Sequence, residues 1–215
     1  MTQLGFYPQT VLDLWFPDNG FWESEEAFSA WIRERMYGDM DEIICRDFAE
    51  MTHAAARSEL DHWSDTAEGR IALLIVLDQF PRSLWRDSPA AYAQDIKANR
   101  LILEGVKNGH FAAVKPWKKM FYIIGLGHCE GPDHLDRIAL IEELAEVVIA
   151  ENPPQLAFTA DMIRAQNQRV RSVIERFGRH PHRNAHFGRV SSTEEEAYIA
   201  TGDFPHVARP DLVGE

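Results

Sequence analysis

The sequence predicts an all-α protein built from antiparallel helix pairs. Residues that start and stop helices recur along the chain, whereas alternating apolar and polar runs bounded by turn dipeptides, which indicate β-strands, are missing. The composition is globular, with 45% hydrophobic and 26% charged residues. No low-complexity linker divides the 215 residues, so we expect a single domain over residues 1–215.

The first helices are predicted from a cap and from apolar spacing. Ser24 precedes Glu25 and Glu26, as an N-cap residue precedes acids that favour the positive end of a helix dipole. Apolar residues at helical spacing then carry this helix over residues 25–36. A second apolar stripe predicts another helix over about residues 40–56.

The next predicted helix lies inside the domain. Thr66 starts it, and its run over residues 71–77 is apolar on every side, so no face is suited to solvent. We expect this helix to end near Phe80, because Pro81 disfavours helical geometry in the residue before it.

The second half of the chain is punctuated in the same way. The expected helices lie between Ser88-Pro89 and Asn108-Gly109, from Pro116 onward, over residues 133–150, over residues 159–177 with Gly178 as a left-handed cap, and from a capping box at Ser192 and Glu195 to Thr201-Gly202. Short connections favour antiparallel packing of neighbours. The tetratricopeptide consensus with its 34-residue period is absent, so any superhelical stacking would be irregular.

Charge and cysteine content exclude several classes of partner. Twenty-two Lys and Arg residues against 34 Asp and Glu residues give a formal net charge of −12. Nucleic acid and anionic membranes require a positive face, so we expect neither as a partner. Cys45 and Cys129 lie far apart and form no C-x-x-C unit, which favours a reducing cytoplasm. The N-terminal segment lacks the pattern of a signal peptide or a membrane span.

A charged residue directly follows the all-apolar run. Asp78 and Gln79 come at its end, and Arg82 follows shortly after. An unpaired carboxylate there would lose hydration at a cost of roughly several kcal/mol, so a cationic partner, Arg82 or another arginine, must meet it. Two interpretations stay open. The pair could be a structural device that fixes the helix end, or it could line a polar pocket.

A basic segment stands inside this acidic protein. Between residues 164 and 189 the one acid is Glu175, and the basic side chains are Arg164, Arg169, Arg171, Arg176, Arg179, Arg183, Arg189, His180, His182 and His186. These arginines could pair with acidic helices around them. They could also converge on a cleft, where guanidinium groups would grip a carboxylate or a phosphate.

The histidines permit a metal site only with further ligands. His180 and His182 form an H-x-H pair, and the candidates for a third ligand are His128, Glu130, His134 and Asp136. Because no ligand set is defined, we assign no metal-binding residue and no cofactor. A histidine general acid or base is an alternative, and Cys129 beside His128 is a weaker candidate for a nucleophile.

Several motifs are similar to those of a bacterial family catalogued as domain of unknown function 924. They are Leu-Asp-Leu-Trp-Phe at 12–16, Glu-Leu-Asp-x-Trp at 59–63, Leu-Asp-Gln-Phe-Pro-Arg at 77–82, Tyr-Ala-x-Asp at 92–95, Arg-Phe-Gly-Arg-x-Pro-His-Arg-Asn at 176–184 and Gly-Arg at 188–189. The resemblance covers nearly the whole chain and implies an irregular, tetratricopeptide-like α/α superhelix with no established activity. The chain departs from the family pattern at His180 and His186. This departure favours His182, Arg183 and Asn184 as the site residues.

These observations lead to one expected function and two alternatives. We expect a small anionic ligand to bind in a polar pocket formed by Asp78, Gln79, Arg82, Arg179, His182, Arg183 and Asn184. The alternatives are a tetratricopeptide-like module that binds a peptide or protein partner, and a metal-dependent hydrolase. The sequence does not decide whether the protein is an enzyme, which ligand it takes, whether segments 78–82 and 179–184 meet, or the oligomeric state.

Overall fold

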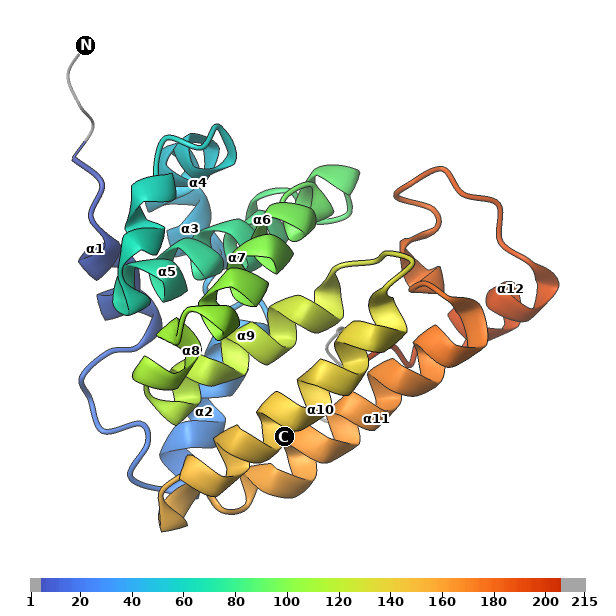
Figure 1. Ribbon diagram of the computed structural model, residues 1–215. Helices are drawn as coiled ribbons and strands as arrows, with labels where there is room; N and C mark the ends of the chain where they lie inside the picture. Colours follow the sequence, from blue (N-terminus) through green and yellow to red (C-terminus); the bar gives the residue numbers. More distant parts are fainter. Residues whose placement is uncertain (1–4, 206–215) are drawn as a thin grey trace.

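A computed structural model describes residues 5–205, and every regular element in that range is helical (Figure 1). The prediction of an all-α fold is confirmed. The α-helices are α1 (Pro8–Trp15), α2 (Glu25–Met36), α3 (Asp41–Asp47), α4 (Ala49–Ala56), α5 (Ala67–Leu74), α6 (Phe80–Leu84), α7 (Asp95–Lys107), α8 (His110–Ala113), α9 (Pro116–His128), α10 (His134–Glu151), α11 (Thr159–Phe177) and α12 (Thr193–Ile199). A π-helical turn, η2 (Ile75–Gln79), joins α5 to α6, and 3₁₀ turns η1 (Asp61–Asp65), η3 (Pro89–Tyr92), η4 (Pro154–Leu156) and η5 (Pro181–Arg183) connect other helices.

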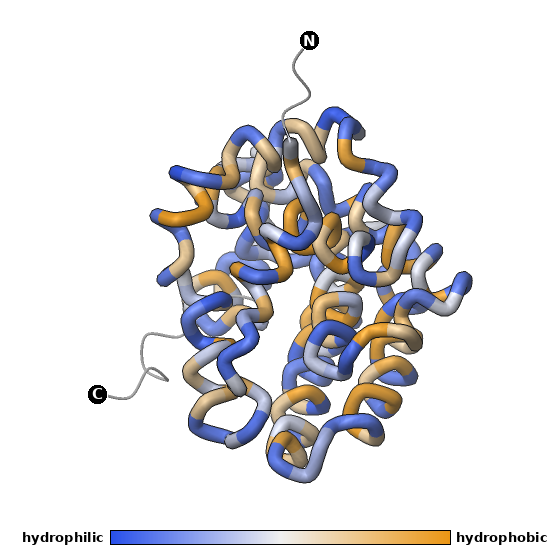
Figure 2. Tube along the Cα trace, turned by 90° about the vertical axis from the view of Figure 1, so that its left-hand side faces the viewer, coloured by the Kyte–Doolittle hydropathy of each residue, from blue (hydrophilic) through white to orange (hydrophobic). Residues whose placement is uncertain are grey.

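Helix α5 and the π turn after it form the centre of the molecule. Residues 71–77 are at most 1% exposed, and α5 contacts α1, α7, α8 and α9. Buried apolar residues from Val11 to Ile174 belong to one cluster. Figure 2 shows hydrophilic residues concentrated at the outer turns of the bundle. The central position of the apolar run, expected from its lack of a polar face, is confirmed.

The predicted caps are confirmed where the sequence signal is local. The hydroxyl of Ser24 accepts a hydrogen bond from the backbone N–H of Ala27 at 3.1 Å, and α2 has the predicted bounds. Thr66 caps α5 in the same way. Gly178 adopts a left-handed conformation with φ +68° after α11, and the capping box at the start of α12 is formed.

The expectation that the central helix ends near Phe80 is wrong. Phe80 keeps helical dihedrals, φ −61° and ψ −37°, and its N–H donates to the carbonyl of Ile75, five residues earlier. The chain then continues into α6 with Pro81 in its first turn. In a regular α-helix the proline ring would collide with the carbonyl of Leu77, and the widened π turn accommodates that ring.

Two other predicted helices are interrupted. The segment 40–56 breaks at Phe48, whose φ of −118° and ψ of 1° separate α3 from α4 and whose ring packs 5.2 Å from that of Phe80. Ser88 caps the next segment by accepting from Ala90 N–H, but it starts a 3₁₀ turn, and α7 begins only at Asp95. Helices α1 and α8 are short elements that the sequence analysis did not predict.

The C-terminal half consists of long helices packed side by side. Helix α10 contacts both α9 and α11, and α10 and α11 run antiparallel (Figure 1). Antiparallel pairing is therefore present here, whereas the tetratricopeptide-like superhelix stays a prediction. Among the described residues, no helix combines the length and apolar character needed to cross a membrane. Cys45 and Cys129 are free thiols.

Candidate functional site

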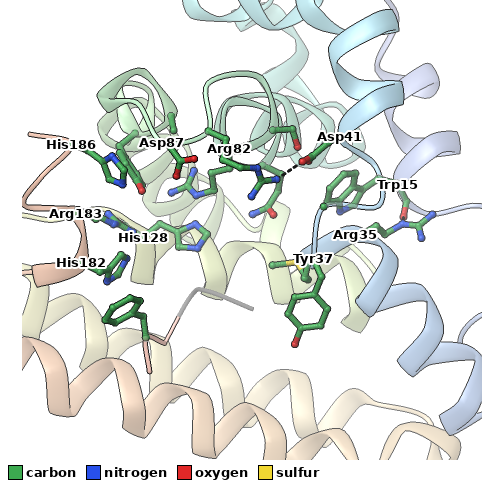
Figure 3. Close-up of a pocket in the computed structure, with 18 residues that line it drawn as sticks. Trp15, Arg35, Tyr37, Asp41, Arg82, Asp87, His128, His182, Arg183 and His186 are labelled. Atoms are coloured by element: carbon green, nitrogen blue, oxygen red, sulfur yellow. Dashed lines mark hydrogen bonds and ion pairs between the residues drawn. The ribbon is translucent and has the colours of Figure 1, made fainter. Parts of the chain in front are cut away.

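A cavity of about 370 Å³ lies where the segment after α11 meets the end of the central helix (Figure 3). Most of the residues in its wall are charged or polar. The charged and polar residues that line it are Arg35, Asp41, Gln79, Arg82, Ser83, Arg86, Asp87, His128, His182, Arg183 and His186. Aromatic residues Trp15, Tyr37, Tyr92 and Phe204 complete much of the wall. Segments that are about 100 residues apart in the sequence thus contribute to one site.

The segments 78–82 and 179–184 meet through a third residue, Asp95 at the start of α7. The Nη2 atom of Arg82 lies 3.0 Å and 3.2 Å from the two carboxylate oxygens of Asp95. The Nη1 atom of Arg183 lies 3.7 Å from Asp95 Oδ2. Sequence reasoning did not assign Asp95 to the site, although the Tyr-Ala-x-Asp motif at 92–95 contains it.

Asp78 has the cationic partner that its burial requires. Its side chain is 4% exposed, and Arg82 Nη1 lies 3.3 Å from Oδ1. The Gln79 amide also donates to the carboxylate. On the other side, Nδ1 of His128 lies 2.9 Å and 3.0 Å from the two carboxylate oxygens. Asp78 itself does not line the cavity, but it binds three side chains that do, those of Gln79, Arg82 and His128.

The local structure explains how His128 reaches Asp78. The π turn η2 places Asp78 in the interior, and α9 approaches it closely at Gly125. A Cβ atom at Gly125 would lie 2.6 Å from Ile102 Cδ1 and 3.8 Å from Asp78 Cγ. The glycine therefore permits the approach that brings His128, at the end of α9, against the carboxylate.

Arg183 is the most deeply buried cation of the wall, with 2% of its side chain exposed. Its Nη1 donates to the backbone carbonyl of His128 at 2.7 Å, and its guanidinium carbon lies 4.5 Å from the centre of the Tyr92 ring. Its Nε has no acceptor among residues 5–205. The indole Nε1 of Trp15, also in the wall, likewise has no acceptor in the described part of the chain.

Burial controls the electrostatics of the network. It raises the pKa of Asp78 and raises that of Asp95 to about 6, and the charge of Arg82 opposes both shifts. Burial, together with Arg82 and Arg183, lowers the pKa of His128 well below its ordinary value. Burial and Arg183 lower the pKa of His182 to about 3. Both histidines are therefore uncharged at neutral pH.

The seven residues expected from the sequence fall into three places. Gln79, Arg82, His182 and Arg183 line the cavity, and Asp78 lies directly behind the wall. Arg179 and Asn184 lie elsewhere. Arg179 binds both carboxylate oxygens of Glu195 at 2.7 Å and 2.9 Å, and Asn184 donates to Ser191 at 3.0 Å. These two contacts attach the segment 179–184 to α12 and to the loop before it.

Most arginines of the basic segment, residues 164–189, pair with acidic residues around them, and one lines the cavity. Arg171 binds Glu142 with two hydrogen bonds of 2.7 Å, and the other pairs are Arg164 with Glu146, Arg176 with Glu194 and Arg189 with Glu130. These arginines neutralise acidic residues around them. Of the arginines between residues 164 and 189, all of which the structure describes, Arg183 lines the cavity.

The histidine cluster does not supply a metal site within residues 5–205. The rings of His134 and His180 are 5.5 Å apart, and those of His180 and His182 are 5.6 Å apart. His180 Nε2 lies 3.2 Å from the carbonyl oxygen of Gly127 instead. In this part of the chain, no three His, Cys, Asp or Glu side chains are arranged to hold a metal ion.

Comparison with known proteins identifies similar sequences and structures but no activity. The model of a family described as bacterial protein of unknown function, DUF924, matches residues 11–203. A solved structure of a protein of unknown function from Agrobacterium tumefaciens is 26% identical, with a TM-score of 0.69 over 91% of this chain and 97% of the other. No curated protein matches the chain.

Proposed function

The chain belongs to the bacterial DUF924 family of unknown function, and we propose what its cavity binds. We propose that the protein is cytoplasmic and that the cavity binds a small anion, either a carboxylate or a phosphate. The observation that carries this proposal is the state of Arg183. A guanidinium group that is 2% exposed lines a cavity, and its Nε has no acceptor among the described residues.

An anion would complete the hydrogen bonding of Arg183. Guanidinium has five N–H donors and cannot lose its charge in a protein, so a buried arginine needs acceptors. Leaving a buried donor unmatched costs roughly 1–3 kcal/mol, and more for a charged group. Carboxylate and phosphate oxygens match the geometry of the guanidinium fork, which makes an oxyanion the ligand class that this donor selects.

The arrangement of charge favours an anion on the cavity side of the network. Arg82 and Arg183 line the cavity, whereas their partners Asp78 and Asp95 lie behind them. These two cationic groups therefore stand between the buried carboxylates and the ligand space, and the wall contains four arginines, Arg35, Arg82, Arg86 and Arg183, against two carboxylates, Asp41 and Asp87. The neutral imidazole of His182 adds a further polar group to the wall. A volume of about 370 Å³ suits a small molecule.

Isothermal titration calorimetry with inorganic phosphate, acetate, malonate and citrate tests this proposal. We expect saturable binding of at least one anion, and about tenfold or greater weakening in Arg183→Lys, since a charge-assisted hydrogen bond contributes roughly 1.5–3 kcal/mol. Lysine keeps the charge but lacks the fork. Arg164→Lys, at an exposed pair with Glu146, is the matched control and should bind like the wild type.

A second variant guards against loss of folding. Arg82→Lys alters a side chain that is 22% exposed, so it disturbs the interior less than a change at Arg183. Circular dichroism confirms that each variant is folded before titration. Absence of binding by all four anions, or equal affinity in Arg183→Lys, Arg82→Lys and the wild type, would contradict the proposal.

A further inference from the structure

The cavity wall around Arg183 is aromatic as well as charged. The centre of the Tyr92 ring lies 4.5 Å from the guanidinium carbon of Arg183 and 5.7 Å from that of Arg82. His182, which lies on the same side of the cavity as Arg183 in Figure 3, stacks on the ring of Phe204, with 4.7 Å between the ring centres and 21° between the planes. Tyr92, His182 and Phe204 all line the cavity. Binding of a charged group alone does not account for this surface.

Contacts with α11 hold Phe204 in the cavity wall. Arg169 binds the carboxylate of Asp203 and donates to the backbone carbonyl of Phe204 at 3.2 Å. Gln166, also on α11, donates to the carbonyl of Pro205. The backbone on both sides of the Phe204 ring is therefore attached to one helix, and part of the side chain stays exposed. An apolar surface that is already in place loses little conformational entropy when a ligand contacts it.

The charges around the cavity limit the charge of its ligand. The wall contains four arginines and two carboxylates, and the two buried carboxylates of Asp78 and Asp95 lie directly behind it. The four cations therefore face four carboxylates in all. The lowered pKa values of His128 and His182 leave both side chains uncharged at neutral pH. A ligand with one charge disturbs this balance least, whereas each further charge would enter a partly buried site without a partner.

A monocarboxylate with an apolar group satisfies both the aromatic surface and the charge balance. Its carboxylate matches the guanidinium fork of Arg183, and its hydrocarbon part has aromatic rings beside that arginine to contact. Phosphate has no apolar part. A dicarboxylate with the same number of carbon atoms replaces the terminal methyl group of the monocarboxylate by a second charge. The uncharged part of the ligand is therefore the part by which this wall distinguishes one small anion from another.

We propose that the cavity selects monocarboxylates that carry an aliphatic group of two or more carbon atoms, and that Phe204 is a specificity-determining residue that contacts this group. The proposal rests on the proposed function, because Arg183 must first hold the carboxylate. Burial of one CH₂ group raises affinity by about twofold to fourfold, depending on how completely it is buried. Phe204 contributes to this gain with chain length and not to binding of the carboxylate itself.

Isothermal titration calorimetry with acetate, propionate, butyrate and succinate tests the proposal. Butyrate should bind about fourfold to sixteenfold more tightly than acetate, and more tightly than succinate, which has the same number of carbon atoms. Phe204→Ala should remove most of the gain from acetate to butyrate and change the affinity for acetate by less than about twofold. Phe204→Leu keeps an apolar side chain and should keep most of the gain. Tyr7→Ala, at an aromatic residue that is 66% exposed and outside the wall, is the control and should bind like the wild type.

Nuclear Overhauser effects between protein and ligand locate the aliphatic group independently of the affinities. In protein with labelled phenylalanine, the methyl protons of butyrate should show an effect to the ring protons of Phe204, assigned by their loss in Phe204→Leu. Binding of acetate without a gain for butyrate, succinate bound as tightly as butyrate, an unchanged series in Phe204→Ala, or no effect between butyrate and Phe204 would overturn this inference and leave the proposed function standing. Absence of binding by all these carboxylates and by phosphate would overturn the proposed function with it.

Discussion

Replacement of Arg183 by methionine should destabilise the protein far more than replacement of a comparable surface arginine. Methionine fills a similar volume and removes the charge. In the wild type the guanidinium group is 2% exposed, donates to the His128 carbonyl and shares Asp95 with Arg82. After the change, Arg82 alone faces both Asp78 and Asp95, which leaves one buried carboxylate charge uncompensated, and the His128 carbonyl loses its donor.

The magnitude follows from the burial of these groups. Breaking a buried ion pair by removing one partner costs roughly 3–5 kcal/mol. A chain of this size loses roughly 2–4 °C in melting temperature per kcal/mol, so the decrease should be roughly 6–20 °C. Arg164 and Glu146 are 52% and 57% exposed, and an exposed pair contributes roughly 0–1 kcal/mol. Arg164→Met is therefore the matched control.

Urea unfolding followed by tryptophan fluorescence measures both variants. The midpoint should fall for Arg183→Met with little change in the slope of free energy against urea, because the same surface is exposed on unfolding. A free energy of unfolding for Arg183→Met within about 1 kcal/mol of that for Arg164→Met would refute the reasoning. In that case the guanidinium group would not be energetically coupled to the buried network.

Two further changes test other parts of the structure. Gly125→Ala should lower the free energy of unfolding by roughly 1–3 kcal/mol, because its Cβ would lie 2.6 Å from Ile102 Cδ1; a neutral effect in thermal unfolding would show that the Ile102 side chain can turn aside. Burial lowers the pKa of His134 to about 4, so the unfolded state binds an additional proton as pH falls below 6.5 and stability is lost between pH 6.5 and 4. His134→Gln should lose up to about 1.4 kcal/mol less per pH unit than the wild type in this window, and parallel pH profiles in urea titrations would contradict this.

The sequence predicted those parts of the fold that depend on neighbouring residues. The caps at Ser24, Thr66 and Ser192 each bind a backbone N–H within three residues, so a local pattern suffices to find them. The burial of the central run follows from its lack of a polar face. Pro81 misled the prediction because the cost of a proline in a helix depends on whether the turn can widen, and the packing of the whole core decides that.

The site was predicted only in part, because tertiary contacts complete it. The need of Asp78 for a cation follows from burial alone, and Arg82 meets it. Asp95 and His128 reach the network from α7 and α9, and no local pattern specifies which helices pack against the π turn. Arg179 has the same chemistry as Arg183 four residues later, but it faces Glu195 and not the cavity.

The central claim, that Arg183 Nε donates to a bound anion, is most directly tested by ¹H–¹⁵N NMR of the arginine Nε groups. Titration with inorganic phosphate, or with the anion that binds most tightly in calorimetry, should shift the Arg183 Nε–H resonance until it saturates. The dissociation constant from this shift should equal the one measured by calorimetry. Arg183→Lys assigns the resonance by its loss. An Arg183 resonance that does not move while the anion binds, or that follows the linear drift of exposed arginines such as Arg164, would contradict the claim.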